Sequence, residues 1–113
     1  MAISEVDKKR ISKWCEAQTP VEHLASMRVE ATFRGNSAEI FDVRPPWHPD
    51  LGDEWTWMRV AKVTWAPSTN TWALFAVNRH DKLIHYSEEI RTPSTLIGVL
   101  REIESDPTCI FWG

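Results

Sequence analysis

The chain is short of the residues with which small proteins build crosslinks and cofactor cradles. Its only two cysteines, Cys15 and Cys109, lie far apart, and they form neither the paired spacing of a zinc site nor a disulfide scaffold. Its four glycines form no Gly-rich phosphate loop, which excludes the familiar nucleotide-binding motifs. No cysteine shows a recognisable arrangement with a histidine base. We therefore expect reduced thiols and no cofactor.

Long apolar runs and a strong net charge are also missing. No stretch approaches the roughly 18 apolar residues of a membrane helix, and residues 1–10 lack the apolar centre of a signal peptide. The formal net charge of −3 argues against a domain that holds nucleic acid through bulk positive charge, although a local basic face stays open. We therefore expect a cytoplasmic protein that makes no membrane contact, with nucleic acid as a disfavoured partner.

What the sequence does contain is enough apolar material for a core and an unusual supply of tryptophan. Hydrophobic residues make up 42% and charged residues 26% of the chain, which is the balance of one packed domain over residues 1–113. Of the seven tryptophans, six lie where we expect strands, loops and the C-terminal tail: Trp47, Trp55, Trp57, Trp65, Trp72 and Trp112. An aromatic core is therefore expected.

The pattern of apolar residues predicts a helix near each end of the chain. Ser4, with Asp7 three residues later, resembles a capping box before a segment of helical period. Near the C-terminus, Thr92-Pro93 is predicted to open a second helix, and Asp106 to close it. Both helices should present one apolar stripe to the core.

Between these helices the apolar residues recur at every second position, as in strands separated by turns. The predicted strands are residues 28–34, 38–44, 55–65, 71–77 and 83–86. One side of the third strand is expected to carry Trp57, Arg59, Ala61, Val63 and Trp65, and apolar residues on both sides make it a central strand. The fold class predicted is α+β, an antiparallel meander of about five strands with an N-terminal and a C-terminal helix packed on one face.

Residues 44–55 are predicted to form a loop, because three prolines within five residues remove ladder donors. We select Arg44, Trp47, His48 and Trp55 from this loop as candidate binding residues, together with Arg59 on the next strand. Trp47 would be a rigid aromatic anchor if it projects from the loop; alternatively, it folds back onto the sheet.

The same loop holds the densest group of polar side chains in the chain. His48, Asp50 and Glu54 could bind a divalent cation, and Lys62 on the next strand could orient a phosphate or a water. Such a set would suit a metal-dependent hydrolase that acts on a phosphodiester. The alternative is that these acids are simply solvated, as acids in loops usually are.

The strands also carry arginines, among them Arg28, Arg34 and Arg59. An open sheet face with arginines and exposed tryptophans is one way to bind single-stranded nucleic acid. Acidic residues such as Glu30 and Glu39 lie close by in sequence and would cancel much of that field, so ordinary cross-strand charge pairing is the competing interpretation.

Three stretches resemble one protein family: RPPWHPDLGDEW (44–55), TWALF (71–75) and DPTCIFWG (106–113). Together with KWC at residues 13–15, they are similar to a family of short, mostly actinobacterial proteins classed only as a domain of unknown function. The resemblance covers nearly the whole chain. It carries no assigned activity and therefore no site residues, and it implies a stand-alone bacterial domain that is complete as written.

These observations favour a non-catalytic binding or protein-interaction module that works through residues 44–55 and the adjacent sheet face. Its partner would be a protein or a small molecule, and a homodimer stays open. Whether the chain is an enzyme also stays open, although the lack of a nucleophile set or cofactor motif leans against catalysis. The metal-dependent hydrolase is the first alternative, and single-stranded nucleic-acid binding is the second.

Overall fold

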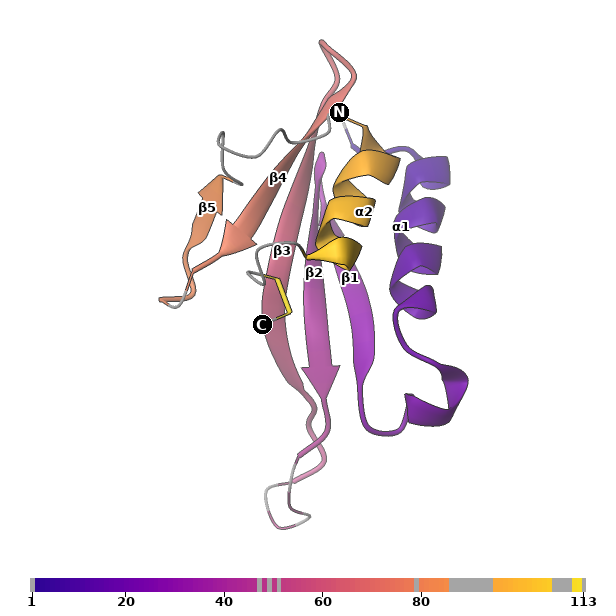
Figure 1. Ribbon diagram of the computed structural model, residues 1–113, viewed down its shortest axis with the longest axis vertical. Coiled ribbons are helices and arrows are strands. Elements are labelled where there is room, and N and C mark those ends of the chain that lie inside the picture. Colours follow the sequence, from indigo (N-terminus) through magenta and orange to yellow (C-terminus); the bar gives the residue numbers. More distant parts are fainter. Residues whose placement is uncertain are drawn as a thin grey trace.

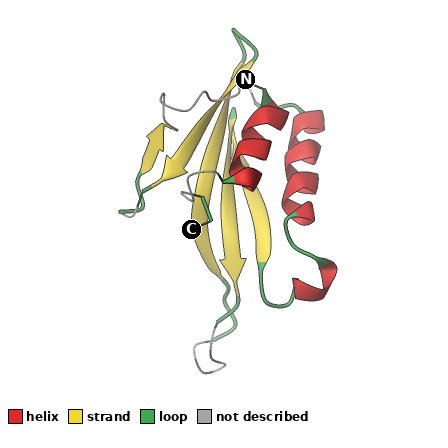
Figure 2. Cartoon of the chain, in the orientation of Figure 1, coloured by secondary structure: helices red, strands yellow, loops and turns green. Residues whose placement is uncertain are grey.

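Two helices lie against one face of an antiparallel sheet (Figures 1 and 2). The computed structural model describes residues 2–46, 48, 50, 52–78, 80–85, 95–106 and 111–112. In chain order its elements are α1 (Glu5–Ala17), the short 3-10 helix η1 (Val21–His23), β1 (Arg28–Arg34), β2 (Ser37–Arg44), β3 (Thr56–Ala66), β4 (Thr71–Val77), β5 (Leu83–His85) and α2 (Leu96–Ser105).

The strands follow one another across the sheet in the order β1-β2-β3-β4-β5, and every neighbouring pair is antiparallel. This is the predicted meander, with β3 in the centre, and the α+β class is confirmed. Gly35 has φ of 58° in the two-residue turn between β1 and β2, a backbone conformation that glycine adopts without strain.

Both helices begin at a hydroxyl cap. The Ser4 hydroxyl accepts a hydrogen bond from the Asp7 backbone N–H at 3.2 Å, as the capping-box pattern predicts. Helix α2 begins at Leu96, and the Thr95 hydroxyl accepts from the Gly98 N–H at 3.0 Å. The prediction of Thr92-Pro93 as the start was therefore wrong by three residues, because Thr95 supplies the capping oxygen instead; residues 92 and 93 lie outside the described residues.

The core lies between the helices and the face of the sheet that they cover, hereafter the helix face. It is formed by aliphatic side chains of α1 and α2 packed on alternate residues of β2, β3 and β4. The largest fully buried side chains are Ile11, Ile40, Val63, Leu74, Val99 and Ile103. Trp72 and Phe111 are the buried aromatic residues of this cluster, so the core is more aliphatic than the tryptophan count suggests.

A β-bulge in the centre of the sheet corrects the predicted alternation of β3. Ile40 pairs with Ala61 while Phe41 pairs with Arg59, so Val60 is an extra residue in β3. Val60 and Ala61 are therefore both buried, and the residues before the bulge change faces. Trp57 and Arg59 lie on the side opposite Ala61, contrary to the prediction that all three share one side. We call that uncovered side the open face.

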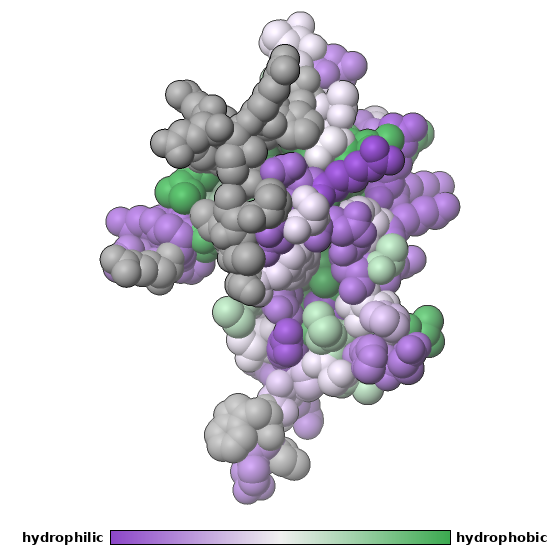
Figure 3. Space-filling view, viewed as in Figure 1, coloured by the Kyte–Doolittle hydropathy of each residue, from purple (hydrophilic) through white to green (hydrophobic). Residues whose placement is uncertain are grey.

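Among the described residues, no helix has both the length and the apolar character needed to cross a lipid bilayer. The outer surfaces of the helices are mostly hydrophilic in the space-filling view (Figure 3).

Candidate binding site at the free edge of a strand

Strand β3 is longer than the strand that follows it. It has 11 residues, whereas β4 has seven and pairs only with residues 61–66 of β3. Strand β4 then splays away from β3 (Figure 1). Within the part of the chain that the structure describes, residues 56–60 of β3 therefore have β2 as their only neighbouring strand, with Thr56 to Arg59 paired and Val60 as the bulged residue. We call them the free half of β3.

A hollow of about 730 Å³ borders this free half, and we call it the notch. It is lined by Glu39 and Phe41 of β2, residues 57–60 of β3, residues 77, 78 and 81 at the β4–β5 turn, and residues 111–112 of the C-terminal tail. At such a site, side chains project from both faces of the strand. Between them lie unpaired backbone groups, because alternate residues of an edge strand direct their N–H and C=O groups outward.

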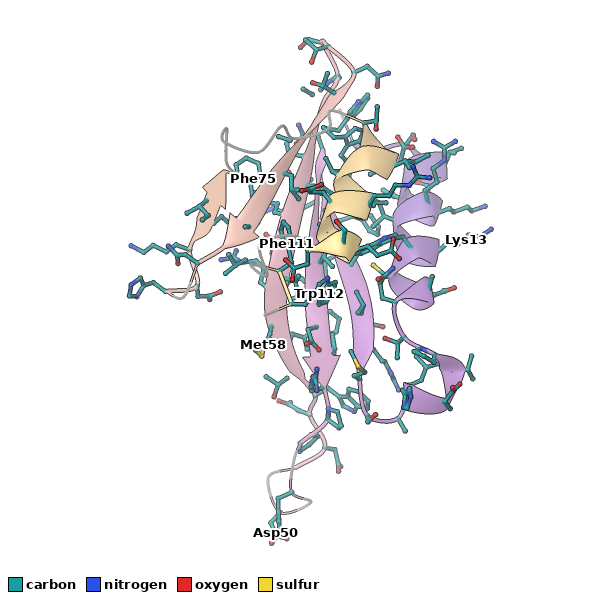
Figure 4. The ribbon with its side chains drawn as sticks, in the orientation of Figure 1. Lys13, Asp50, Met58, Phe75, Phe111 and Trp112 are labelled. Atoms are coloured by element: carbon teal, nitrogen blue, oxygen red, sulfur yellow. The ribbon has the colours of Figure 1, made fainter. Side chains whose placement is uncertain are left out.

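The free half of β3 carries an exposed apolar side chain on each of its faces. Trp57 lies on the open face, 46% exposed, and its ring meets Phe41 edge-on at 5.4 Å between centroids. Met58 lies on the helix face and is 62% exposed. Met58 lines the notch together with Phe111 and Trp112 of the C-terminal tail, which lie beside β3 (Figure 4). Large side chains this exposed on both faces of one strand edge are typical of an interaction surface.

Arg59 is the one charged residue of the free half, and it spans the notch. Its Nη2 donates to the backbone carbonyl oxygen of Asp81 at 2.8 Å, and its guanidinium lies 3.8–3.9 Å from the Asp81 and Glu39 carboxylates. Its Nε is buried and has no hydrogen-bond partner among the described residues. Arg59 thus ties β3 to the β4–β5 turn.

The helix-face wall of the notch is held in place by Asp106, the C-cap of α2. Its two carboxylate oxygens accept hydrogen bonds from the backbone N–H groups of Phe111 at 3.0 Å and Trp112 at 2.9 Å. The Trp112 indole N–H donates to the Ile103 carbonyl oxygen at 2.8 Å. Residues 111–112 of the C-terminal tail are thus docked on α2, whereas Ile110 and Cys109 lie outside the described residues.

The structure does not gather the predicted binding residues into one site. Arg44 lies on the helix face, where its guanidinium makes a two-point contact with Asp42 at 3.1 and 3.4 Å. Arg59 lies on the open face. Trp55 is half-buried beneath Arg28, whose guanidinium carbon lies 4.4 Å from the centre of the indole ring. Trp47 lies outside the described residues.

Asp50 lies at one end of the molecule, in the loop between β2 and β3 (Figure 4), and His48 is two residues before it in the same loop. The His48 Nδ1 accepts from the Asp50 N–H at 3.2 Å and lies 3.4 Å from its carboxylate. Glu54 is exposed farther along the loop. No three His, Cys, Asp or Glu side chains of the described residues are placed to hold one metal ion, and the hypothesis of a metal site stays a prediction.

Lys62 does not belong to the loop. It is the cross-strand partner of Glu39 in the middle of the open face, where it borders a second, polar hollow with Arg34 and Ser37. Lys62 lies six positions along β3 from Thr56, where the loop joins the strand, a distance of about 20 Å at the rise of a β-strand.

Cys15 is enclosed by the core and is a free thiol. Burial raises the pKa of Cys15 from its ordinary value of 9.0 to about 12, and the nearby Glu30 and Glu16 carboxylates add to the shift. A thiol that stays protonated at neutral pH is a poor nucleophile, so Cys15 is a structural residue.

Sequence reasoning missed the notch, although Met58 and Asp81 and the tail residues were all visible in the sequence. The signal was the unequal length of two consecutive predicted strands, residues 55–65 and residues 71–77. In a meander, such a mismatch leaves part of the longer strand without a partner on one side.

Fold and site together define a small α+β domain that presents a free strand edge beside a hollow. The sequence pattern of the family described as Domain of unknown function (DUF3024) matches residues 1–113, so the chain belongs to that family. A search of curated proteins finds no match. A search of solved structures finds none either.

Proposed function

We propose that this domain is a non-catalytic binding module that captures an extended polypeptide segment by adding it as a strand to the free half of β3. The observation that carries this proposal is the coincidence of an unpaired strand edge with exposed apolar side chains in the notch. Main-chain hydrogen bonds give such complexes their affinity, and pockets for alternate side chains give specificity.

The free half of β3 differs from the outer edge of β1. Three of the seven residues of β1 are charged, namely Arg28, Glu30 and Arg34, and charged edges discourage strand addition. In the free half, Arg59 is the single charged residue, and it is already engaged by the β4–β5 turn. The chemistry of the two edges therefore favours β3 as the one that accepts a partner.

The size of the edge favours a peptide segment over a second copy of the chain. Residues 56–60 span about 17 Å at 3.4 Å per residue, enough for a segment of about five residues. A stable interface between two folded proteins uses about 20–30 residues on each side. A homodimer through this edge alone would be too small.

The other two hypotheses have less support. Arg28 covers one face of Trp55, which leaves that ring less able to stack on a base than a bare indole. Lys62 is remote from the loop acids that it would have to assist. The free thiol of Cys15 supports a reducing compartment, and we place the domain in the cytoplasm on that ground.

Two matched lysine variants test the proposed function. Met58→Lys puts a charge at the edge of the free half, whereas Val6→Lys puts the same charge on α1 at a site equally exposed, 62% against 60%. Heptapeptides selected from a random library on the wild-type domain should bind Val6→Lys unchanged and Met58→Lys at least tenfold more weakly. Equal binding by both variants would refute the proposal. Competition by a ten-nucleotide single strand of DNA would favour the open face and nucleic acid instead.

A further inference from the structure

The two faces of the free half place a requirement on whatever segment binds there. Trp57 and Met58 are consecutive residues, so their side chains leave β3 on opposite faces. Trp57 lies with Phe41 on the open face, and Met58 lies beside the tail residues on the helix face. Many strands of antiparallel sheets have one polar, solvated face, but here each face of the edge carries an exposed apolar side chain.

An added strand would continue this arrangement. A segment paired with the free half brings one residue opposite Trp57 and a residue adjacent to it in sequence opposite Met58, because directly opposed residues share a face. The first side chain then packs on the indole ring of Trp57, and the second packs on Met58 and the Trp112 wall that Asp106 holds. Removing exposed apolar surface on both sides of the strand adds favourable free energy to that of the main-chain hydrogen bonds.

We infer that the partner segment carries two consecutive apolar residues, one for the open face and the other for the helix face of the notch. This inference rests on the proposed function, since it names the ligand of the same edge. A segment that alternates apolar and polar residues fills only one of the two faces.

Capped heptapeptides with a common frame of threonine and lysine test the inference. Their central residues are Phe-Leu, Phe-Ser, Ser-Leu, Ser-Ser or the spaced set Phe-Ser-Leu, which keeps both apolar side chains on one face. Affinities are measured from the amide chemical shifts of the ¹⁵N-labelled domain. Phe-Leu should bind most tightly, and each replacement by serine should cost about tenfold or more, because each removes one buried side chain.

The peptide with the spaced set Phe-Ser-Leu distinguishes the effect of the faces on which the apolar side chains lie from the effect of the peptide's composition. It should bind about as weakly as a peptide with a single apolar residue, even though it has the same apolar side chains as Phe-Leu. Equal binding of Phe-Leu and Phe-Ser-Leu would overturn the inference while leaving strand addition intact. Equal binding of all five peptides, including Ser-Ser, would also overturn the inference and leave strand addition intact. Failure of every peptide to bind would overturn the proposed function, and the inference with it.

Discussion

At the scale of single residues, Cys15 shows how burial changes chemistry. The unfolded chain loses the thiol proton near pH 9, whereas the folded chain keeps it until about pH 12. The contribution of Cys15 to stability is therefore complete below pH 9 and is lost as the pH rises toward 12. We predict that the free energy of unfolding of the wild-type chain falls more steeply over this range than that of Cys15→Ala.

The difference in slope should be at most about 1.4 kcal/mol per pH unit, the free energy of one proton equilibrium. Urea unfolding at pH 8, 9.5 and 10.5 measures it. A thiol reagent at pH 8 supplies an independent readout, since it should modify Cys15 only at the rate at which the chain unfolds. The assignment of Cys15 as a buried, protonated thiol would be contradicted if the free energies of unfolding of the wild type and Cys15→Ala changed equally with pH. Rapid labelling of the folded chain by the thiol reagent would also contradict it.

Trp57 and Trp72 differ in burial, and this predicts different roles. Trp72 is 6% exposed in the core, so Trp72→Ala should cost about 3–5 kcal/mol of stability. Trp57→Ala loses mainly an edge contact with Phe41, worth about 1 kcal/mol, yet it should weaken peptide binding at least tenfold. Equilibrium unfolding and peptide titration check both expectations. A loss of stability by Trp57→Ala as large as that of Trp72→Ala would mean that Trp57 is a structural residue.

The residue alternation of β3 shows where sequence reasoning failed. Period-two spacing correctly predicted a strand and its central place, because apolar residues occur on both faces. It could not place the bulge at Val60, since an extra valine in a run of β-branched and aromatic residues leaves no local signal. One inserted residue moves the side chains of the preceding β3 residues to the opposite face of the sheet, and this places Trp57 and Arg59 on the face opposite Ala61.

At the scale of elements, Asp106 links the end of α2 to the wall of the notch. Asp106→Ala removes two hydrogen bonds from a carboxylate to backbone N–H groups and should cost about 2–3 kcal/mol. Asp106→Asn should cost less, because asparagine keeps one acceptor and tolerates the left-handed backbone found there, φ 44°. Thermal unfolding ranks the three proteins. A ranking in which alanine is the milder change would show that the carboxylate does not hold the tail.

The helix caps offer a second prediction at this scale. Ser4→Ala and Thr95→Ala each remove one side-chain acceptor from the first turn of a helix and should each cost about 1 kcal/mol. Ser4→Asp is the control, because aspartate caps as well as serine does. Urea midpoints are the measurement. A Ser4→Asp variant as unstable as Ser4→Ala would indicate that the hydroxyl acts elsewhere than at the cap.

Element boundaries were predictable where the chemistry is local. The Ser4 cap, the turn at Gly35 and the strand at residues 28–34 follow from residue types within a few positions. The start of α2 was misplaced because Thr92 and Thr95 are both good caps, and packing of the apolar stripe decides between them. The free half of β3 depends on where β4 stops following β3, which is a property of the pair and not of either segment.

At the scale of the whole molecule, the α+β meander followed from composition and period, but the candidate site did not. The predicted working surface was residues 44–55, chosen for their density of polar and aromatic residues. The chain folds so that Arg44 and Arg59 lie on opposite faces and the described loop tip projects from one end. The notch is lined by four segments that are separate in sequence, namely β2, β3, the β4–β5 turn and residues 111–112, so no local sequence pattern could predict it.

Amide hydrogen exchange of the domain, free and saturated with the Phe-Leu heptapeptide, tests most directly whether β3 accepts a strand. Alternate N–H groups of an edge strand point outward, so the peptide should protect every second amide within residues 56–60 and leave the amides of β1 unchanged. Protection confined to β1 or to the described amides of the β2–β3 loop, with residues 56–60 exchanging as in the free protein, would contradict the account.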